Sequence, residues 1–260
     1  MLIFVSSTGR SGTTYLSKLV SHISDTKGYH VPEPQCTGKV LIDCNNYKDN
    51  AVLSVKKESI RKSIKNGRYF ESSPLFLRCF VEEALELGEE MRLPVGVIHL
   101  TRDPLQVARS YNNRNSVPGS LDCVWRLPME ARKNFLKITE GLTSYQKNLW
   151  DWFENEIRFH HYKSKFDKTY DMYFSDLNNI SKLKEMLAFF GMTIDQNKLE
   201  NNLHEGALDK NSNEIKTNVS LEDKKEGGQF IEILKRYDIG NIFDDSYYIK
   251  YKMLNKLRRL

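Results

Sequence analysis

The stretch IFVSSTGRSGTTYLSKLV, residues 3–20, decides the fold. Small and apolar residues run into a loop that contains Gly9 and Gly12, and a segment with helical apolar spacing follows. This order predicts a buried strand, a sharp turn and a helix. Such a turn presents unpaired backbone N–H groups, which the positive end of the helix dipole reinforces. The stretch therefore predicts an anion-binding loop.

The position of the basic residue separates this loop from an ATP-binding one. In the ATP-type pattern GxxxxGK[ST], a lysine follows the last glycine, and it reaches the terminal phosphates while the next hydroxyl holds magnesium. Here Thr13 occupies that place, and Arg10 lies two positions before Gly12. The alternative is a purely structural turn, in which Gly9 and Gly12 satisfy backbone angles and Thr13 caps the helix.

The segment GRSGTTYL resembles the 5′-phosphosulfate loop of sulfotransferases that use 3′-phosphoadenosine 5′-phosphosulfate (PAPS). In that family a Lys or Arg precedes Ser-Gly-Thr-Thr or a close variant. The resemblance implies that the 5′-phosphosulfate is held by Arg10, Ser11, Gly12, Thr13 and Thr14. It also implies a second site, for the 3′-phosphate that distinguishes PAPS from ATP.

A second motif lies in VGVIHLTRDPLQVARSY, residues 95–111. A β-branched strand ends in Arg102, and Asp103-Pro104 begins a helix. An arginine at the carboxyl end of a parallel strand lies in the usual ligand crevice of an α/β sheet. The segment resembles the family's 3′-phosphate motif, an Arg at the strand end and a Ser eight residues later, and Arg102 and Ser110 reproduce that spacing. A surface ion pair of Arg102 with Asp103 is the alternative.

Sulfuryl transfer also needs a base for the acceptor's proton and positive charge at the leaving oxygen. Arg10 supplies charge but cannot act as an acid. Glu33, in GYHVPEPQ, matches the catalytic Glu that many carbohydrate and protein-tyrosine sulfotransferases carry in a Glu-Pro context. His30 is the rival base, because a neutral imidazole suits pH 7 and some cytosolic sulfotransferases use His. Its position inside a predicted strand favours a structural role, so Glu33 ranks first.

Two more ionisable residues lie in predicted strands. Glu71, in YFESSPLF, resembles the Glu of the Glu-Lys-Ser/Thr-Pro stretch of heparan-type sulfotransferases, with Ser72 in place of the Lys. The resemblance implies acceptor binding or support of the site, although the missing Lys weakens the transfer of that subfamily's mechanism. His99 lies in an apolar strand, and we expect it to be a satisfied core residue.

Strands that alternate with helices predict an α/β fold with a central, mainly parallel sheet flanked by helices. No linker or repeat divides the chain, so we expect one domain over residues 1–260. Ser220, followed by Asp223, predicts a further helix start, and Gly227 and Gly228 predict a break or a close backbone approach within that helix. The predicted strands are 2–7, 28–33, 68–73, 95–102 and 168–174, and the main predicted helices are 13–24, 74–91, 104–114, 128–162 and 181–190.

Composition excludes several classes of protein. The net charge of +5 is spread along the chain, and we expect the basic segment 250–260 to form an amphipathic surface helix rather than a nucleic-acid site. Cys36, Cys44, Cys79 and Cys123 form no CxxC pair and have no His at metal-ligand spacing, which predicts free thiols in a reducing compartment. No segment resembles a signal peptide or membrane span, so the cytoplasm is the expected location.

Together these observations predict PAPS-dependent sulfation of a hydroxyl acceptor, with PAP as product and no metal. The Glu33-Pro34 pattern favours a carbohydrate or glycan, while a lipid, another small molecule or a peptide tyrosine would use similar chemistry. The alternatives are a P-loop kinase, which requires ATP and magnesium, and a non-catalytic protein that binds PAP or PAPS. The sequence does not give the oligomeric state.

Overall fold

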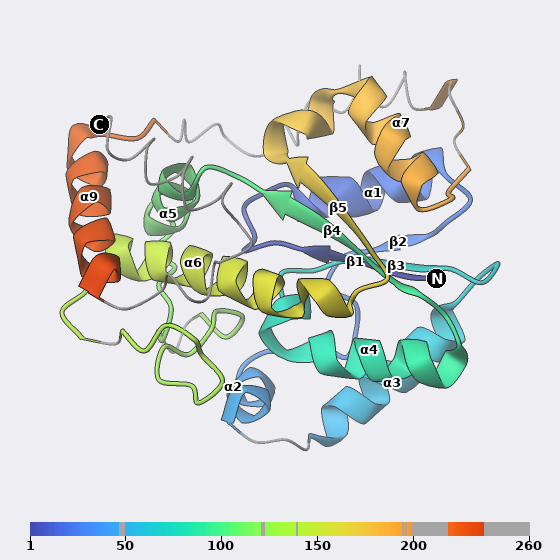
Figure 1. The fold of residues 1–260 in the computed structure, drawn as a ribbon, viewed down its shortest axis with the longest axis horizontal. Coiled ribbons are helices and arrows are strands. Elements are labelled where there is room, and N and C mark those ends of the chain that lie inside the picture. Colours follow the sequence, from blue (N-terminus) through green and yellow to red (C-terminus); the bar gives the residue numbers. More distant parts are fainter. Residues whose placement is uncertain are drawn as a thin grey trace.

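The computed structural model contains a five-stranded, fully parallel sheet with the strand order β2-β3-β1-β4-β5 (Figure 1). This confirms the predicted α/β fold. The strands are β1 (Leu2–Ser6), β2 (Gly28–Tyr29), β3 (Tyr69–Ser72), β4 (Val95–Thr101) and β5 (Lys168–Tyr173). The structure describes residues 1–46, 50–120, 123–138, 140–193, 195, 197–198 and 218–236, so the basic segment 250–260 lies outside the described residues.

Helices cover both faces of the sheet (Figure 1). α1 and α7 pack on one face, and α3, α4 and the end of α6 pack on the other. α5 and α9 pack against α6. The helices are α1 (Thr13–Ile23), α2 (Lys39–Asn46), α3 (Ala51–Ser63), α4 (Val81–Met91), α5 (Pro104–Asn112), α6 (Ser144–Tyr162), α7 (Ile180–Phe189) and α9 (Leu221–Arg236), with a π-helical turn at Phe76–Phe80 and 3₁₀ turns at Lys163–Lys165 and Phe174–Asn178.

The first four residues of the central strand β1 are apolar because both faces of the strand are buried. Ile3 and Val5 pack in the cluster beneath α1 and α7, whereas Leu2 and Phe4 pack in the cluster beneath α4. Phe4 also stacks on Phe76, with ring centroids 4.6 Å apart. Alternate side chains of a strand point to opposite faces, so a strand covered on both sides must be a continuous apolar run.

The predicted helix over 128–162 is wrong in its first half, since α6 begins only after Thr143. The side chain of Thr143 accepts a hydrogen bond from the backbone of the first turn and forms a capping box. Several backbone N–H groups of the preceding segment donate to distant acceptors instead of within a helix. The Glu154 carboxylate, for example, accepts from the N–H groups of Phe135 and Leu136. A tertiary contact therefore replaces the helix that the apolar spacing predicted.

The predicted strand 28–33 is also shorter in the structure, because β2 ends at Tyr29. Val31 adopts a φ of 45°, which interrupts an extended chain, and Pro32 has no N–H to give to a ladder. His30 and Glu33 consequently lie beyond the carboxyl end of the strand. The argument that placed His30 inside a strand is wrong.

The predicted start of α9 is confirmed. Ser220 Oγ accepts from the N–H of Asp223 at 3.1 Å, and the Asp223 carboxylate accepts from the N–H of Ser220 at 2.8 Å. The predicted break at Gly227 and Gly228 is wrong, because α9 continues through both glycines. Its buried Phe230 packs against an aromatic ring of α6. This tertiary packing overrides the low helix propensity of glycine.

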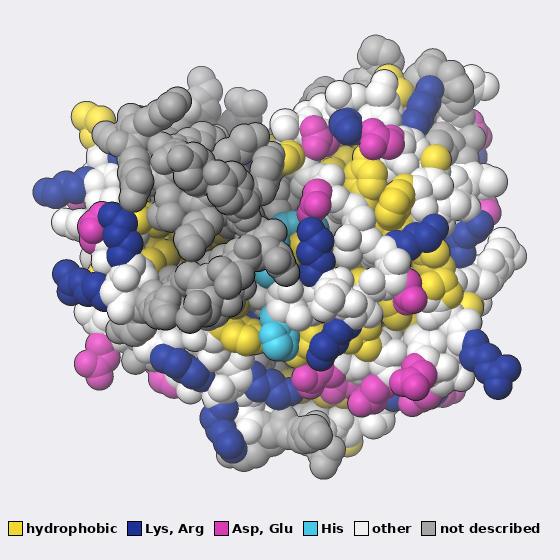
Figure 2. Space-filling view, viewed as in Figure 1, with side chains coloured by type: hydrophobic (Ala, Val, Ile, Leu, Met, Phe, Trp, Pro, Cys, Tyr) yellow, Lys and Arg dark blue, Asp and Glu magenta, His cyan; other side chains and the backbone are white. Residues whose placement is uncertain are grey.

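Acidic and basic side chains are interspersed over the face that Figure 2 shows. On this face the basic side chains are not gathered into one patch. Elsewhere in the structure, ion pairs join α3 to α4: the Lys57 ammonium lies 3.2 Å from the Glu86 carboxylate and 2.8 Å from that of Glu90. None of the helices in the described part of the chain is long and apolar enough to cross a membrane.

His99 of β4 is a satisfied core residue, as expected. Its Nδ1 lies 2.9 Å from Asp171 Oδ1 and its Nε2 lies 3.1 Å from Glu156 Oε2. The ring stacks on Phe159, with centroids 3.7 Å apart. Burial alone would lower the pKa of His99, but the Glu156 carboxylate and the hydrogen bonds to both carboxylates outweigh it and raise the pKa to about 9. The imidazolium therefore links β4, β5 and α6.

This cluster predicts that stability falls in mild alkali. The folded pKa of His99, about 9, lies above the ordinary value of 6.5, so the stabilisation is complete below pH 6.5 and is lost as the pH rises through 9. The loss amounts to about 3 kcal/mol. We expect urea unfolding of the wild type to show this decrease between those pH values and His99→Gln to lack it. Parallel pH profiles for the two proteins would contradict the prediction.

Candidate active site

The loop between β1 and α1 follows a path that its glycines permit. Gly9 and Gly12 have φ values of 87° and 89°, in the left-handed region. A Cβ on Gly9 would lie 2.3 Å from the hydroxyl oxygen of Tyr111, and a Cβ on Gly12 would lie 2.3 Å from Leu177 Cδ1. Both the backbone angle and the available space thus require glycine at these two positions.

The first turn of α1 carries no side-chain cap. Its N-cap residue is Gly12, no side chain accepts a hydrogen bond there, and no acidic residue lies in the first turn. The alternative in which Thr13 caps the helix is therefore wrong. Hydrogen bonds within the loop stabilise it instead. The Ser11 hydroxyl donates to the carbonyl of Gly9, and the Gly9 N–H donates to Ser7 Oγ, both at 3.1 Å. The amide groups at the start of α1 are available to an anion.

The two motifs meet at this loop. Arg102 Nη1 donates to the backbone carbonyl of Arg10 at 2.9 Å, and Arg10 Nε donates to Ser110 Oγ at 3.1 Å. The Arg102 guanidinium also lies over the ring of Phe174, 4.4 Å from its centroid. Residues about one hundred positions apart in the sequence are consequently within hydrogen-bond distance.

The β4–α5 junction holds Arg102 in place. The Asp103 side chain caps α5 by accepting from the N–H groups of Leu105 at 3.0 Å and Gln106 at 3.2 Å. The indole N–H of Trp152 donates to the carbonyl of Arg102 at 3.1 Å. The sequence Asp-Pro therefore forms the predicted helix start, and this start directs Arg102 towards the loop.

The site concentrates positive charge. Burial and the neighbouring Arg114 lower the pKa of Arg10, and burial and Arg10 lower that of Arg102. Arginine stays charged near neutral pH, so these cations repel one another until an anion lies among them. Sequence reasoning missed Arg114. Its position four residues after Ser110, about one helical turn, was the available signal.

His30 contacts the first turn of α1 directly. Its Nδ1 lies 2.7 Å from the carbonyl oxygen of Ser72, and its Nε2 lies 2.9 Å from the hydroxyl oxygen of Thr14. A carbonyl can only accept, so Nδ1 carries the proton and Nε2 offers its lone pair to the Thr14 hydroxyl. Burial lowers the pKa of His30, while the bond to Ser72 acts in the opposite direction. The ring is therefore neutral near pH 7, with its basic nitrogen at the loop.

Glu33 has a different setting. It is exposed, and its carboxylate accepts from the N–H of Gln35 at 3.1 Å. Its carbonyl accepts from the Ser59 hydroxyl at 3.2 Å. Within the described part of the chain, neither of these contacts reaches the β1–α1 loop. The role of Glu33 as the base stays a prediction.

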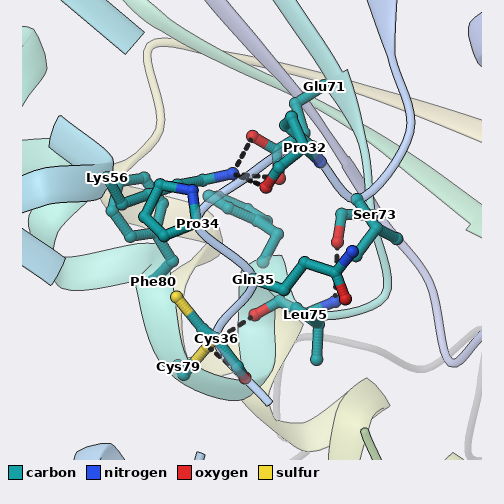
Figure 3. Close-up of a pocket in the computed structure, with 12 residues that line it drawn as sticks. Pro32, Pro34, Gln35, Cys36, Lys56, Glu71, Ser73, Leu75, Cys79 and Phe80 are labelled. Carbon is teal, nitrogen blue, oxygen red and sulfur yellow. Dashed lines mark hydrogen bonds and ion pairs between the residues drawn. The ribbon is translucent and has the colours of Figure 1, made fainter. Parts of the chain in front are cut away.

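Glu71 lies buried beside a small pocket (Figure 3). Its carboxylate lies 3.0 Å from Lys56 Nζ and accepts from the Tyr69 hydroxyl at 2.6 Å. Lys56 also donates to the carbonyl of Pro32 at 3.1 Å. The lysine that the family stretch carries after its Glu is Ser72 here, and Lys56 of α3 supplies an ammonium group from a distant position. These contacts indicate that Glu71 supports the segment after β2.

The four cysteines are free thiols. Cys79 Sγ donates to the carbonyl of Leu75 at 3.3 Å and lies 3.8 Å from the carbonyl oxygen of Cys36. Among the residues that the structure describes, no group of three or more His, Cys, Asp or Glu side chains is placed to hold a metal ion.

A known protein family matches nearly the whole chain. The sequence model described as "Sulfotransferase domain" matches residues 2–259, and the chain therefore belongs to the sulfotransferase family. Members of this family transfer a sulfuryl group and generally use PAPS as its donor. No curated protein matches the chain.

Burial of His30 predicts a pKa below the ordinary value of 6.5. In an NMR titration, the imidazole signal that is missing from His30→Gln should titrate below this value, with Nδ1 protonated in the neutral form. A titration at or above 6.5 would contradict the lowered pKa, and protonation at Nε2 in the neutral ring would contradict the assignment of Nε2 as the basic atom.

Proposed function

We propose that this sulfotransferase transfers the sulfuryl group of PAPS to a hydroxyl group of a glycan, lipid or other small molecule, with a carbohydrate as the preferred acceptor. The main support is the convergence of the two motifs, in which Arg10 contacts both Arg102 and Ser110. The preference for a carbohydrate rests on the Glu33-Pro34 pattern.

The loop suits the 5′-phosphosulfate group. The left-handed glycines, the uncapped first turn of α1 and the side chain of Arg10 offer N–H groups and charge to one anion. In the proposed site, Arg10, Ser11, Gly12, Thr13 and Thr14 hold this group. A second anion, the 3′-phosphate, lies against Arg102 and Ser110, with Arg114 close enough to Arg10 to add charge.

In the proposed reaction, one set of groups stabilises the leaving phosphate oxygen and another takes the proton of the acceptor. PAPS, when bound, supplies the activated sulfuryl group. Arg10 and the N–H groups at the start of α1 stabilise negative charge on the leaving phosphate oxygen. Once the Thr14 hydroxyl donates to the bound phosphosulfate, His30 Nε2 is free to accept the proton of the acceptor hydroxyl, and the Ser72 carbonyl holds the ring in the required tautomer.

We place His30 ahead of Glu33 as the base because His30 already contacts Thr14 in the first turn of α1. The Glu33 carboxylate instead accepts a hydrogen bond from the nearby N–H of Gln35. This order reverses the one that the sequence suggested. Glu33 remains the competing base, since its exposed side chain is free to rotate towards an acceptor.

The two bases can be separated by substitution. We expect His30→Gln to lower the turnover number by about 10²- to 10⁴-fold, because a general base is lost, with PAP affinity retained. Glu33→Gln, the matched control, should keep most of its activity in a PAPS-dependent assay with a simple sugar or phenol acceptor. The reverse result would identify Glu33 as the base.

The 3′-phosphate site can be tested with product nucleotides. Arg102→Ala and Ser110→Ala should each weaken PAP binding by about tenfold or more and leave ADP binding nearly unchanged, because only PAP carries a 3′-phosphate. Calorimetry on both variants would measure this, with the exposed residues Arg132 and Ser54 changed to Ala as controls. Equal losses for PAP and ADP would refute the assignment.

The proposal also covers the cellular location, the domain organisation and the metal requirement of the protein. The free thiols of the cysteines favour a reducing compartment such as the cytoplasm. We also propose that residues 1–260 form one catalytic domain without a metal requirement and without a nucleic-acid partner. The family match argues against a kinase. A non-catalytic PAP-binding protein would differ by showing no sulfuryl transfer with any acceptor.

A further inference from the structure

A buried charged cluster lies directly behind the loop. Arg78, Arg126 and Asp151 are at most 3% exposed. Arg78 Nη2 donates to the Asp151 carboxylate and to the backbone carbonyl of Thr8, both at 2.8 Å. Thr8 immediately precedes Gly9. The cluster therefore contacts the anion-binding loop through its backbone.

Tyr111 is the second link between cluster and loop. Its hydroxyl donates to the same Thr8 carbonyl at 2.7 Å and fills the space that a Cβ of Gly9 would need. The Arg126 guanidinium lies over the other part of this residue, 3.6 Å from the centroid of the ring. Arg126 is thus separated from the loop by a single aromatic side chain.

The buried guanidinium of Arg126 makes few hydrogen bonds. Its Nη2 donates to Asn148 Oδ1 at 2.7 Å and lies 3.3 Å from the Asp151 carboxylate. Its Nε and Nη1 are buried, and no hydrogen-bond partner for either lies among the residues that the structure describes. Buried polar atoms normally find partners, and an unpaired one destabilises the fold. Folding alone gives no reason for an arginine here.

The charges of the cluster do not cancel. Arg78 and Arg126 are two cations, and Asp151 is the one carboxylate among the described residues that pairs with them. The neighbouring Arg158 has its own partner, Glu154, at 2.8 Å. One positive charge is therefore left uncompensated. In a buried setting such a charge acts over a longer range than at the surface and is screened little by salt.

We propose that Arg126 is a positioning residue for the donor, which acts from behind the loop by orienting Tyr111 and by adding a buried positive charge to the phosphosulfate site. This inference rests on the proposed function. It explains why an incompletely bonded arginine is kept in the core: the charge costs stability and favours binding of a polyanionic nucleotide.

The test compares Arg126→Met with the charge-conserving control Arg126→Lys. Both are measured by displacement of labelled PAP with unlabelled PAP and with adenosine, which has no charge, and by thermal unfolding. We expect Arg126→Met to raise the dissociation constant of PAP about tenfold, to leave that of adenosine within about twofold, and to unfold at or above the wild-type temperature. Arg126→Lys should keep most of the PAP affinity.

Two results would overturn the inference. One is wild-type PAP affinity in Arg126→Met, and the other is an equal loss for PAP and adenosine, which a merely structural role predicts. If Arg126→Met does not fold, Arg126→Gln carries the same test because it keeps a donor for Asn148. Failure of the wild type itself to bind PAP would instead refute the proposed function.

Discussion

The backbone between β1 and α1 can turn as it does only because Gly9 and Gly12 carry no Cβ. Tyr111 occupies the space beside Gly9, and Leu177 occupies the space beside Gly12. The turn therefore brings the end of the buried strand β1, the start of α1 and the ends of β4 and β5 to one place. The positions of both arginines of the site, Arg10 and Arg102, depend on this convergence.

Two sides of the loop have different physical tasks. On the outer side, Arg10, Arg102 and the uncapped start of α1 gather positive charge, and His30 offers a neutral basic nitrogen. On the inner side, side chains of the core hold the Thr8 carbonyl by two hydrogen bonds. Without ligand, repulsion between the arginine side chains would move them apart if the loop were mobile. The two hydrogen bonds to the Thr8 carbonyl hold the loop in place against this repulsion.

The sequence predicted what depends on neighbouring residues. The Gly-rich turn, the Asp-Pro helix start and the parallel strands all follow local rules, and the structure bears them out. Contacts between distant positions escaped prediction. The segment before α6 is irregular because the Glu154 carboxylate binds its backbone, and β2 ends early because of the backbone at Val31. The contacts of His30 also escaped prediction because its partners Thr14 and Ser72 lie on other elements.

Thermal stabilisation of the purified chain by PAP, compared with magnesium-ADP and without any acceptor, tests the central claim most directly. A site that holds a 5′-phosphosulfate at the loop and a 3′-phosphate at Arg102 predicts a clear rise in unfolding temperature with PAP and little change with magnesium-ADP. A larger rise with magnesium-ADP than with PAP would contradict this account of the donor site.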